Sequence, residues 1–260
     1  MSVLALSGVE VALGKRQVLR GIDLELDTGE LVGLVGRNGA GKTTLLRVAT
    51  RMLAPDAGEV WLRGRPVSQH TRRELAREVA VVAQDTTLPF AFRVAELVLM
   101  GRAPHLGWLG FERAHDHALA EAALDRLGLL HLADRSVLEI SGGERQLVLI
   151  ARALAQQAPV LLLDEPTAHL DLHHRLQVLG LLRDLAREGR TVLVISHDLT
   201  LVARFCDRLA LLSEGRLAVG PPAELLQPER LREGFDLDAE ILHTAAGEPV
   251  VVPHLDRGAR

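Results

Sequence analysis

Gly36-Arg37-Asn38-Gly39-Ala40-Gly41-Lys42-Thr43-Thr44 matches the pattern G-x-x-x-x-G-K-[ST], and this stretch decides the fold. Its glycines let the backbone curl so that successive N–H groups face one anion, and a helix start adds a favourable dipole. Lys42 is placed to reach the β and γ phosphates of a nucleotide, and Thr43 to ligand Mg²⁺. Lys42 is also one of only two lysines in a chain whose other basic residues are arginines. A chance glycine turn is the alternative, and the strand and helix expected on either side argue against it.

Apolar runs and helical periodicities alternate around this loop. Short apolar runs predict buried strands, and apolar residues at helical spacing predict helices between them. Such alternation is typical of an α/β fold with a mostly parallel sheet covered on both faces. The expected strands are 3–13, 17–26, 31–35, 59–62, 79–82, 160–163, 191–195, 207–212 and 216–219, and the expected helices are 42–51 and 173–187.

The texture changes between about residues 90 and 157. Strand-like runs disappear there, and helical periodicity is found at 94–100, 114–127 and 144–157. We interpret this region as an inserted α-helical subdomain. The predicted division is a nucleotide-binding core with a β-subdomain at 1–88 and 158–222, a helical subdomain at 89–157, and a C-terminal tail at 223–260, whose role stays open.

The composition limits the class of protein. The 260 residues carry a net charge of −4 without blocks of one sign, which is weak evidence against nucleic-acid binding. Cys206 is the single cysteine, which fits a reducing compartment and is best interpreted as a small buried apolar residue. We expect neither a membrane span nor a secretory signal, so any action at a membrane needs another chain.

Asp164 and Glu165 end an apolar run, Val160-Leu-Leu-Leu, that is expected to be a buried strand. Asp164 at the strand end is suited to hold the Mg²⁺ shell, directly or through water. Glu165 is then placed to orient or polarise an attacking water. Two solvated acids at an ordinary strand end are the alternative, which the phosphate loop makes less attractive.

Ser141-Gly142-Gly143-Glu144 opens an expected helix. Ser141 and Glu144 have the spacing of a capping box. The serine and two glycines also leave backbone N–H groups exposed at a helix start, which is suited to a second anion site. Both interpretations stay open from these residues alone.

These motifs, in this order, resemble the ATP-binding cassette family from about Val3 to Leu226. The Ser-Gly-Gly element distinguishes that family among proteins with this phosphate loop. The resemblance places Gln84 in the Q-loop, Asp171 in the D-loop and His197 at the switch position. It implies a P-loop NTPase of RecA-like type, with a parallel-sheet core, an N-terminal antiparallel β-subdomain and an inserted α-helical subdomain.

The resemblance also implies an ATP hydrolase that works as a head-to-tail homodimer. Each ATP would lie between the phosphate loop of one copy and the Ser141 element of the other, so that hydrolysis opens the pair. The implied cofactors are ATP and Mg²⁺. The catalytic residues would be Lys42, Gln84, Glu165 and His197, and the metal ligands Thr43, Gln84 and Asp164. The residues implied to bind nucleotide are Leu13, Gly36, Arg37, Asn38, Gly39, Ala40, Gly41, Lys42, Thr43, Thr44, Ser141, Gly142, Gly143, Glu144 and Asp171.

Two departures from the family pattern stand out. Ile140 and Glu144 replace the usual leucine and glutamine around the Ser-Gly-Gly element, and neither is expected to inactivate. The family often stacks an aromatic residue on adenine near Leu13 or Gly14, whereas this chain has no aromatic there and no tyrosine at all. Losing the stacking removes roughly 1 kcal/mol, so we expect GTP to compete with ATP better than usual.

Val94 to Gly107 and Asp164 to His174 resemble the ATPases of type II importers for iron–siderophore, haem and vitamin B12. The resemblance implies integral-membrane permease subunits as partners, a periplasmic or surface substrate-binding protein indirectly, and a position on the cytoplasmic face of the inner or plasma membrane. The helix at 94–100 and the loop at 104–108 would form the docking face, with Trp108 as an anchor. A helix and loop that fit any cassette are the alternative.

Other interpretations stay open. His169, His173 and His174 have a spacing that suits a metal site, but polar packing explains them as well. A non-transport cassette acting on nucleic acid or ribosomes is the rival function, and a catalytically dead regulatory cassette is another. The cargo cannot be read from this chain, since iron–siderophore, haem and cobalamin fit equally.

Overall fold

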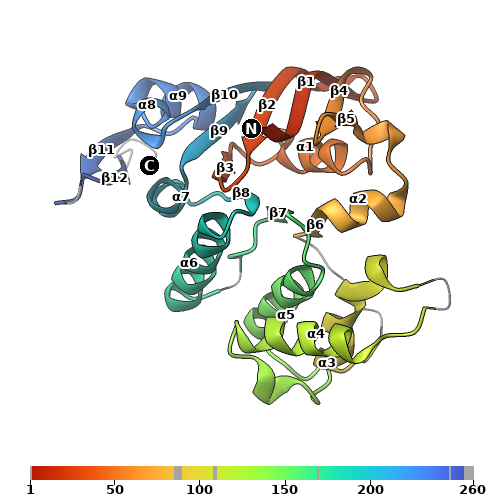
Figure 1. The fold of residues 1–260 in the computed structure, drawn as a ribbon. Helices are drawn as coiled ribbons and strands as arrows, with labels where there is room; N and C mark the ends of the chain where they lie inside the picture. Colours follow the sequence, from red (N-terminus) through yellow and green to blue (C-terminus); the bar gives the residue numbers. More distant parts are fainter. Residues whose placement is uncertain (1, 85–89, 108–109, 169, 246, 255–260) are drawn as a thin grey trace. The chain divides into compact units, whose positions relative to one another are not determined.

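The computed structural model describes residues 2–84, 90–107, 110–168, 170–245 and 247–254 (Figure 1). The chain forms two compact units. The first unit comprises 1–69 with 179–260, and the second comprises 70–178. Helix α6 (Leu172–Arg187) runs from the second unit into the first. In the part of the chain described, no helix is both long and apolar enough to cross a membrane.

The first unit begins with an antiparallel sheet in the order β2-β1-β4-β5. β1 pairs with β2 through Leu6 opposite Leu24 and Val9 opposite Ile22, and these side chains are buried. One face of the sheet therefore supplies an apolar core, as alternation in an antiparallel sheet predicts. The strands are β1 (Ser2–Leu13), β2 (Arg16–Asp27), β4 (Ala57–Leu62) and β5 (Arg65–Pro66).

Strands β10, β9, β3 and β8 follow one another in the second sheet of this unit. β3 is parallel to both β8 and β9, while β10 returns antiparallel to β9. Every residue of β3 and β8 is buried, which explains why both are continuous apolar runs in the sequence. The elements are β3 (Leu31–Val35), α1 (Lys42–Ala49), η1 (Val67–Gln69), β8 (Thr191–Ile195), α7 (Leu199–Phe205), β9 (Arg208–Ser213) and β10 (Arg216–Gly220).

The second unit holds the parallel pair β6 and β7 and a set of packed helices. Helices α3 and α4 both pack on α5, whose buried side is a row of apolar residues from Leu147 to Ala155. The elements are α2 (Arg72–Glu78), β6 (Val79–Val82), α3 (Val94–Leu99), η2 (Met100–His105), α4 (Ala114–Asp125), η3 (Leu130–Leu132), α5 (Gly142–Ala155) and β7 (Val160–Asp164).

The described residues of the C-terminal tail form two short helices and two strands. A hairpin of β11 and β12 packs on α7, where the Val251 N–H donates to Thr200 Oγ1 at 3.2 Å and Arg204 pairs with Glu248 at 2.9 Å. The tail elements are α8 (Pro222–Leu225), α9 (Pro228–Phe235), β11 (Ala239–His243) and β12 (Pro249–Pro253).

The predicted α/β architecture, with its N-terminal antiparallel sheet and its helical insertion, is confirmed. The short helices α2 and α7 and the tail elements were not expected, because segments of four to eight residues carry too little periodicity to predict. Cys206 is buried, as expected, and burial raises the pKa of its thiol. The division at 88, 157 and 222 stays a prediction.

Asp207 ties the start of β3 to α6 within the first unit. Its Oδ2 accepts from the Leu31 N–H at 3.0 Å and lies 2.6 Å from Arg183 Nη1. We expect Asp207→Ala to lower the free energy of unfolding by about 1–3 kcal/mol, because a buried strand N–H loses its acceptor. Urea titration of both proteins measures this. Asp184→Ala is the control, since Asp184 pairs with Arg187 on the exposed side of the same helix and its loss should cost less than about 0.5 kcal/mol. Equal losses in the two variants would contradict the assignment.

Candidate functional site

The phosphate loop connects β3 to α1 in the first unit, and its entry point admits no side chain. A Cβ on Gly36 would overlap the carbonyl oxygen of Leu212 in the neighbouring strand β9. At the other end Gly41 has φ of 110° and precedes α1 as its N-cap residue. The loop therefore depends on glycine at both ends, by close approach at one and by backbone conformation at the other.

The start of α1 presents backbone donors. Gly41 has no side chain to cap the helix, and no acidic residue lies in the first turn. Uncapped N–H groups and the helix dipole favour an anion at this position. The phosphate loop thus lies between the strand and the helix that the sequence predicted.

Lys42 lies across the loop that precedes it. Its side chain is 7% exposed, and Nζ donates to Gly36 O at 2.7 Å and to Arg37 O at 3.0 Å. The ammonium is therefore held beside the N–H groups of the loop by backbone carbonyls. A phosphate oxygen is a stronger acceptor than a carbonyl, so these bonds can be exchanged for contacts to a nucleotide.

Arginines surround a pocket of about 540 Å³ beside the loop. Arg16 and Arg20 project from β2, and Arg16 Nη2 donates to Gly39 O at 3.2 Å. Arg37 pairs with Asp236 of the tail at 3.5 Å. The pocket is lined by Arg16, Val18, Arg20, Arg37, Asn38, Gly39, Ala40, Ser213, Glu214, Gly215 and Gly234. Arg16 and Arg20 were not among the predicted site residues, although two arginines four positions apart on one strand share a face and were a usable signal.

His197 follows β8 at the same sheet edge as the phosphate loop. Leu34 of β3 lies opposite Ile195, and the Ser196 N–H donates to Leu34 O at 3.2 Å. The cap of α7 is Asp198, whose Oδ1 accepts from the Leu201 N–H at 3.0 Å. His197 itself is exposed.

Leu13 ends β1 opposite Arg16, at the turn into β2. Its side chain is 49% exposed, so an apolar surface is available at the place where the family resemblance expects an aromatic ring.

Gln84, Asp164 and Glu165 come together in the second unit. Val82 and Leu163 lie opposite one another in the parallel strands β6 and β7, so these polar residues follow the same sheet edge. Gln84 Nε2 lies 3.4 Å from Glu165 Oε2. Asp164 is 3% exposed, and Glu165 has φ of 49°, a conformation that is uncommon outside glycine and concentrated at functional sites.

Ser141 and Glu144 form the capping box at the start of α5. The Ser141 N–H donates to Glu144 Oε2 at 2.8 Å, and the Glu144 N–H donates to Ser141 Oγ at 3.2 Å. Hydrogen bonds from the side chain and the backbone of Ser141 hold the pKa of Glu144 below its usual value. Gly142 has open space where a side chain would be, so the backbone of the first turn remains accessible.

Asp171 caps the next helix. Its Oδ1 accepts from the His174 N–H at 2.9 Å and lies 2.8 Å from His174 Nδ1, and the backbone bond above all lowers the pKa of Asp171. His169 and Trp108 lie outside the described residues. Within those residues no cluster of three or more metal-ligating side chains occurs.

The two sets of predicted residues belong to different units. The loop from Gly36 to Thr44, Leu13 and His197 lie in the first unit. Gln84, the Ser141–Glu144 element, Asp164, Glu165 and Asp171 lie in the second. The oxygens of Thr43, Gln84 and Asp164 are hard donors of the kind that Mg²⁺ prefers, so the residue types fit this ion.

Known proteins resemble this chain over most of its length. The ABC transporter family model matches residues 19–168. The hemin import ATP-binding protein HmuV of Streptomyces coelicolor is 47% identical over 96% of this chain and 89% of its own length. The cobalamin import ATP-binding protein BtuD of Halobacterium salinarum is 42% identical over 98% of this chain and 64% of its own length. An inward-facing structure of a metal-chelate type ABC transporter has a chain that superimposes with a TM-score of 0.86, at 30% identity over 98% of this chain and 99% of that one.

The stability that the capping box contributes should depend on pH. Ser141→Ala should lower the free energy of unfolding by about 1 kcal/mol at neutral pH. Because the pKa of Glu144 is lowered in the folded protein, its contribution is present above the ordinary value of 4.5 and is lost as the pH falls through the lowered value. The deficit of the variant should therefore shrink in acid, as measured by urea titration from pH 7 to pH 3.

Ser136→Ala is the matched control. Ser136 Oγ accepts from the Leu138 N–H at 3.3 Å without a carboxylate partner, so its deficit should not depend on pH in this way. A deficit for Ser141→Ala that stayed constant down to pH 3 would show that the box does not act through Glu144.

Proposed function

The chain belongs to the ABC transporter family, and from that premise we propose that it is the ATP-hydrolysing subunit of an importer that takes up a metal chelate through a partner permease. The observation that carries the proposal is the phosphate loop itself, with glycine forced at Gly36 by the Leu212 carbonyl and Lys42 held beside the open helix start. The relatives named above are import ATP-binding proteins for hemin and cobalamin.

ATP is bound through its phosphates. The N–H groups from Gly36 to Thr44 surround the anion, and Lys42 exchanges its bonds to Gly36 O and Arg37 O for the β and γ phosphates. The apolar side chain of Leu13 contacts the base.

Thr43, Gln84 and Asp164 are proposed to hold Mg²⁺, which supplies charge neutralisation between the phosphates when it is bound. Asp164 contributes the buried carboxylate of this set. Gln84 would hold the ion while also contacting Glu165, because its amide nitrogen lies 3.4 Å from Glu165 Oε2.

Glu165 orients and polarises the attacking water, and its half-buried position is suited to a carboxylate that must accept a proton. His197 and Lys42 stabilise the charge on the transferring phosphoryl group. Glu165 has a left-handed backbone conformation, which costs energy and supports a functional role for the position of its side chain.

A second copy completes the site. Ser141, Gly142 and Gly143 of the partner offer backbone donors to the γ phosphate, with Glu144 held back in the capping box. Asp171 acts at the same seam. ATP thereby joins the two copies, and hydrolysis releases them, which makes the opening and closing of the pair the working motion.

The permease lies in the membrane, so this subunit works at the cytoplasmic face of the inner or plasma membrane, and a periplasmic or surface substrate-binding protein delivers the cargo. Haem, cobalamin and iron–siderophore all belong to the class of metal chelates. The permease and the binding protein contact the cargo, and this subunit supplies the force.

Glu165→Gln tests the shared site. The variant should bind Mg-ATP but hydrolyse it at least 100-fold more slowly, so that light scattering shows a stable dimer with Mg-ATP and a monomer without it. Glu121→Gln on the exposed face of α4 is the control and should hydrolyse ATP like the unmodified chain. A variant that stays monomeric with Mg-ATP, together with a per-molecule rate of the unmodified chain that is independent of dilution, would overturn the proposal.

Leu13→Tyr tests base selectivity. A ring at this position should raise the preference for ATP over GTP about fivefold, which corresponds to about 1 kcal/mol of stacking. Competition of GTP against ATP in the hydrolysis assay measures the ratio. Leu242→Tyr is the matched control, because Leu242 is also 49% exposed and lies in the tail strand β11. A strong ATP preference already present in the unmodified chain would refute the expectation.

A further inference from the structure

A buried ion pair lies at the centre of the helical part of the second unit. Arg102 Nε lies 3.0 Å from Asp116 Oδ1, and the two residues are only 4% and 7% exposed. Arg102 belongs to η2, and Asp116 lies in the first turn of α4. A buried pair of this kind is costly to desolvate and is often no more stabilising than an apolar pair, so its presence calls for a role in fixing geometry.

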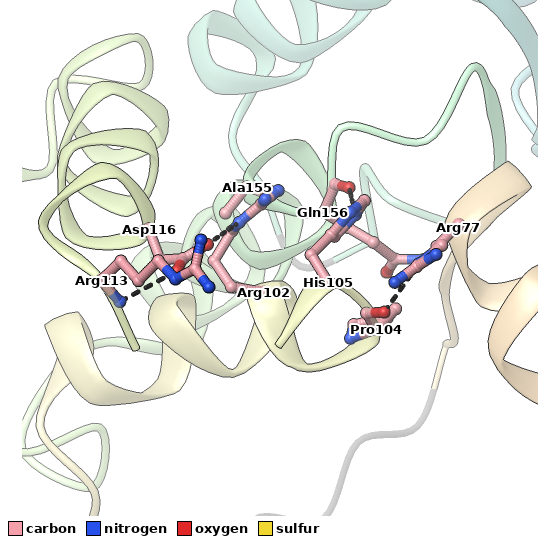
Figure 2. A network of polar contacts seen from close by, with 8 residues as sticks. All are labelled: Arg77, Arg102, Pro104, His105, Arg113, Asp116, Ala155 and Gln156. Atoms are coloured by element: carbon pink, nitrogen blue, oxygen red, sulfur yellow. Dashed lines mark hydrogen bonds and ion pairs between the residues drawn. The ribbon is translucent and has the colours of Figure 1, made fainter. Parts of the chain in front are cut away.

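The same guanidinium also bonds to α5. Nη1 of Arg102 donates to the carbonyl oxygen of Ala155 at 2.8 Å, at the last residue of that helix (Figure 2). The neighbouring Gly101 packs so tightly that a Cβ there would overlap the carbonyl oxygen of Arg152. Arg102 therefore joins three elements, η2, α4 and α5, through one planar group with donors in fixed directions.

His105 and Pro104 extend this connection. His105 Nε2 lies 2.8 Å from Gln156 O, and Arg77 Nε donates to Pro104 O at 2.9 Å (Figure 2). Arg73 Nε donates to the same oxygen, also at 2.9 Å. Gln156 in turn donates from Nε2 to the carbonyl oxygens of Ala76 and Val79. Burial lowers the pKa of His105, which favours the neutral ring that donates one N–H to Gln156.

This network meets the chain just after α5 and just before β7. The opposite end of α5 carries the Ser141-Gly142-Gly143 element, and β7 ends at Asp164. All of these residues belong to the second unit. A displacement of η2 relative to α5 would therefore reach both the start of that helix and the strand that carries the hydrolytic acids.

One side of η2 remains exposed. Met100 is 43% exposed, and Ala103 and Gly107 are exposed as well, whereas Gly101 and Arg102 are buried against α4 and α5. The outer side of η2 is therefore open to contact with another molecule. Its inner side is hydrogen-bonded through Arg102 to Ala155 and through His105 to Gln156.

We propose that Arg102 is a positioning residue which makes Met100–His105 a rigid link between the outer side of η2 and helix α5, and so couples ATP hydrolysis to transport. The inference rests on the proposed function, because it assigns the outer side of η2 to contact with the permease. Arg102 and Asp116 are not among the residues proposed to bind nucleotide, and a pair that only stabilised the fold would leave the coupling ratio unchanged.

The test replaces both charges at once, so that neither is left buried without its partner. Arg102→Met with Asp116→Leu is reconstituted with the permease in lipid vesicles, and haemin, cobalamin and a ferric siderophore are tested separately as cargo. Hydrolysis by the subunit alone should stay within twofold of the unmodified chain. The number of ATP molecules hydrolysed per imported cargo molecule should rise about tenfold.

Arg93→Met with Asp134→Leu is the matched control, since this pair also joins an arginine to an aspartate in the same unit but is exposed. Its coupling ratio should equal that of the unmodified complex. Should the Arg102 and Asp116 double variant unfold, Arg102→Lys decides the matter. A single ammonium cannot keep the forked bonds to Asp116 and Ala155 together, so its coupling ratio should rise as well.

The outcomes separate the two proposals. A folded double variant, or a folded Arg102→Lys, with the coupling ratio of the unmodified complex would overturn the link while leaving the importer function intact. An unmodified complex that imports none of the three cargoes would overturn the proposed function instead.

Discussion

The contact between Gly36 and the carbonyl oxygen of Leu212 is the constraint on which the first unit depends. It forces the chain to leave β3 without a side chain, and it brings the loop beside the start of α1. The start of that helix and the ammonium of Lys42, which donates to Gly36 O, are therefore placed where one anion is proposed to bind. The chemistry of the site follows from backbone geometry, since most of the donors are main-chain groups whose directions the buried strand determines.

Capping differs between the two helix starts that are proposed to bind anions. At α1 the N-cap is Gly41, which has no side chain that could cap the first turn. At α5 Ser141 and Glu144 satisfy one another, so this helix start is stable before any ligand arrives. Ser141 Oγ accepts from the Glu144 N–H, so the box uses neither the Gly142 N–H nor the Gly143 N–H. A capping box and an anion site are therefore compatible at the same helix start, and the two interpretations of the sequence do not exclude one another.

Polar contacts, as well as apolar packing, fix the positions of the helices in the helical part of the second unit. Leu147 to Ala155 supply the buried side of α5, but such an apolar surface tolerates small shifts. The forked bonds of Arg102 to Asp116 and Ala155 do not tolerate such shifts, because the guanidinium is planar and its donors have fixed directions. This is a physical reason for a buried charge pair in a region that, under the proposed coupling, transmits motion without deforming.

The sequence by itself determined the phosphate loop, the buried strands and the helices with strong periodicity, because these depend on residue types at short, fixed spacing. It also located Asp164, Glu165 and His197 behind the strands that carry them. Only the tertiary structure decided which distant groups meet. Arg102 bonds to Ala155, 53 residues further along the chain, and Gln84 contacts Glu165, 81 residues further along. Arg37 pairs with Asp236 in the tail, whose role the sequence left open. Such pairings depend on how packed elements approach one another, and no local pattern in the chain records that approach.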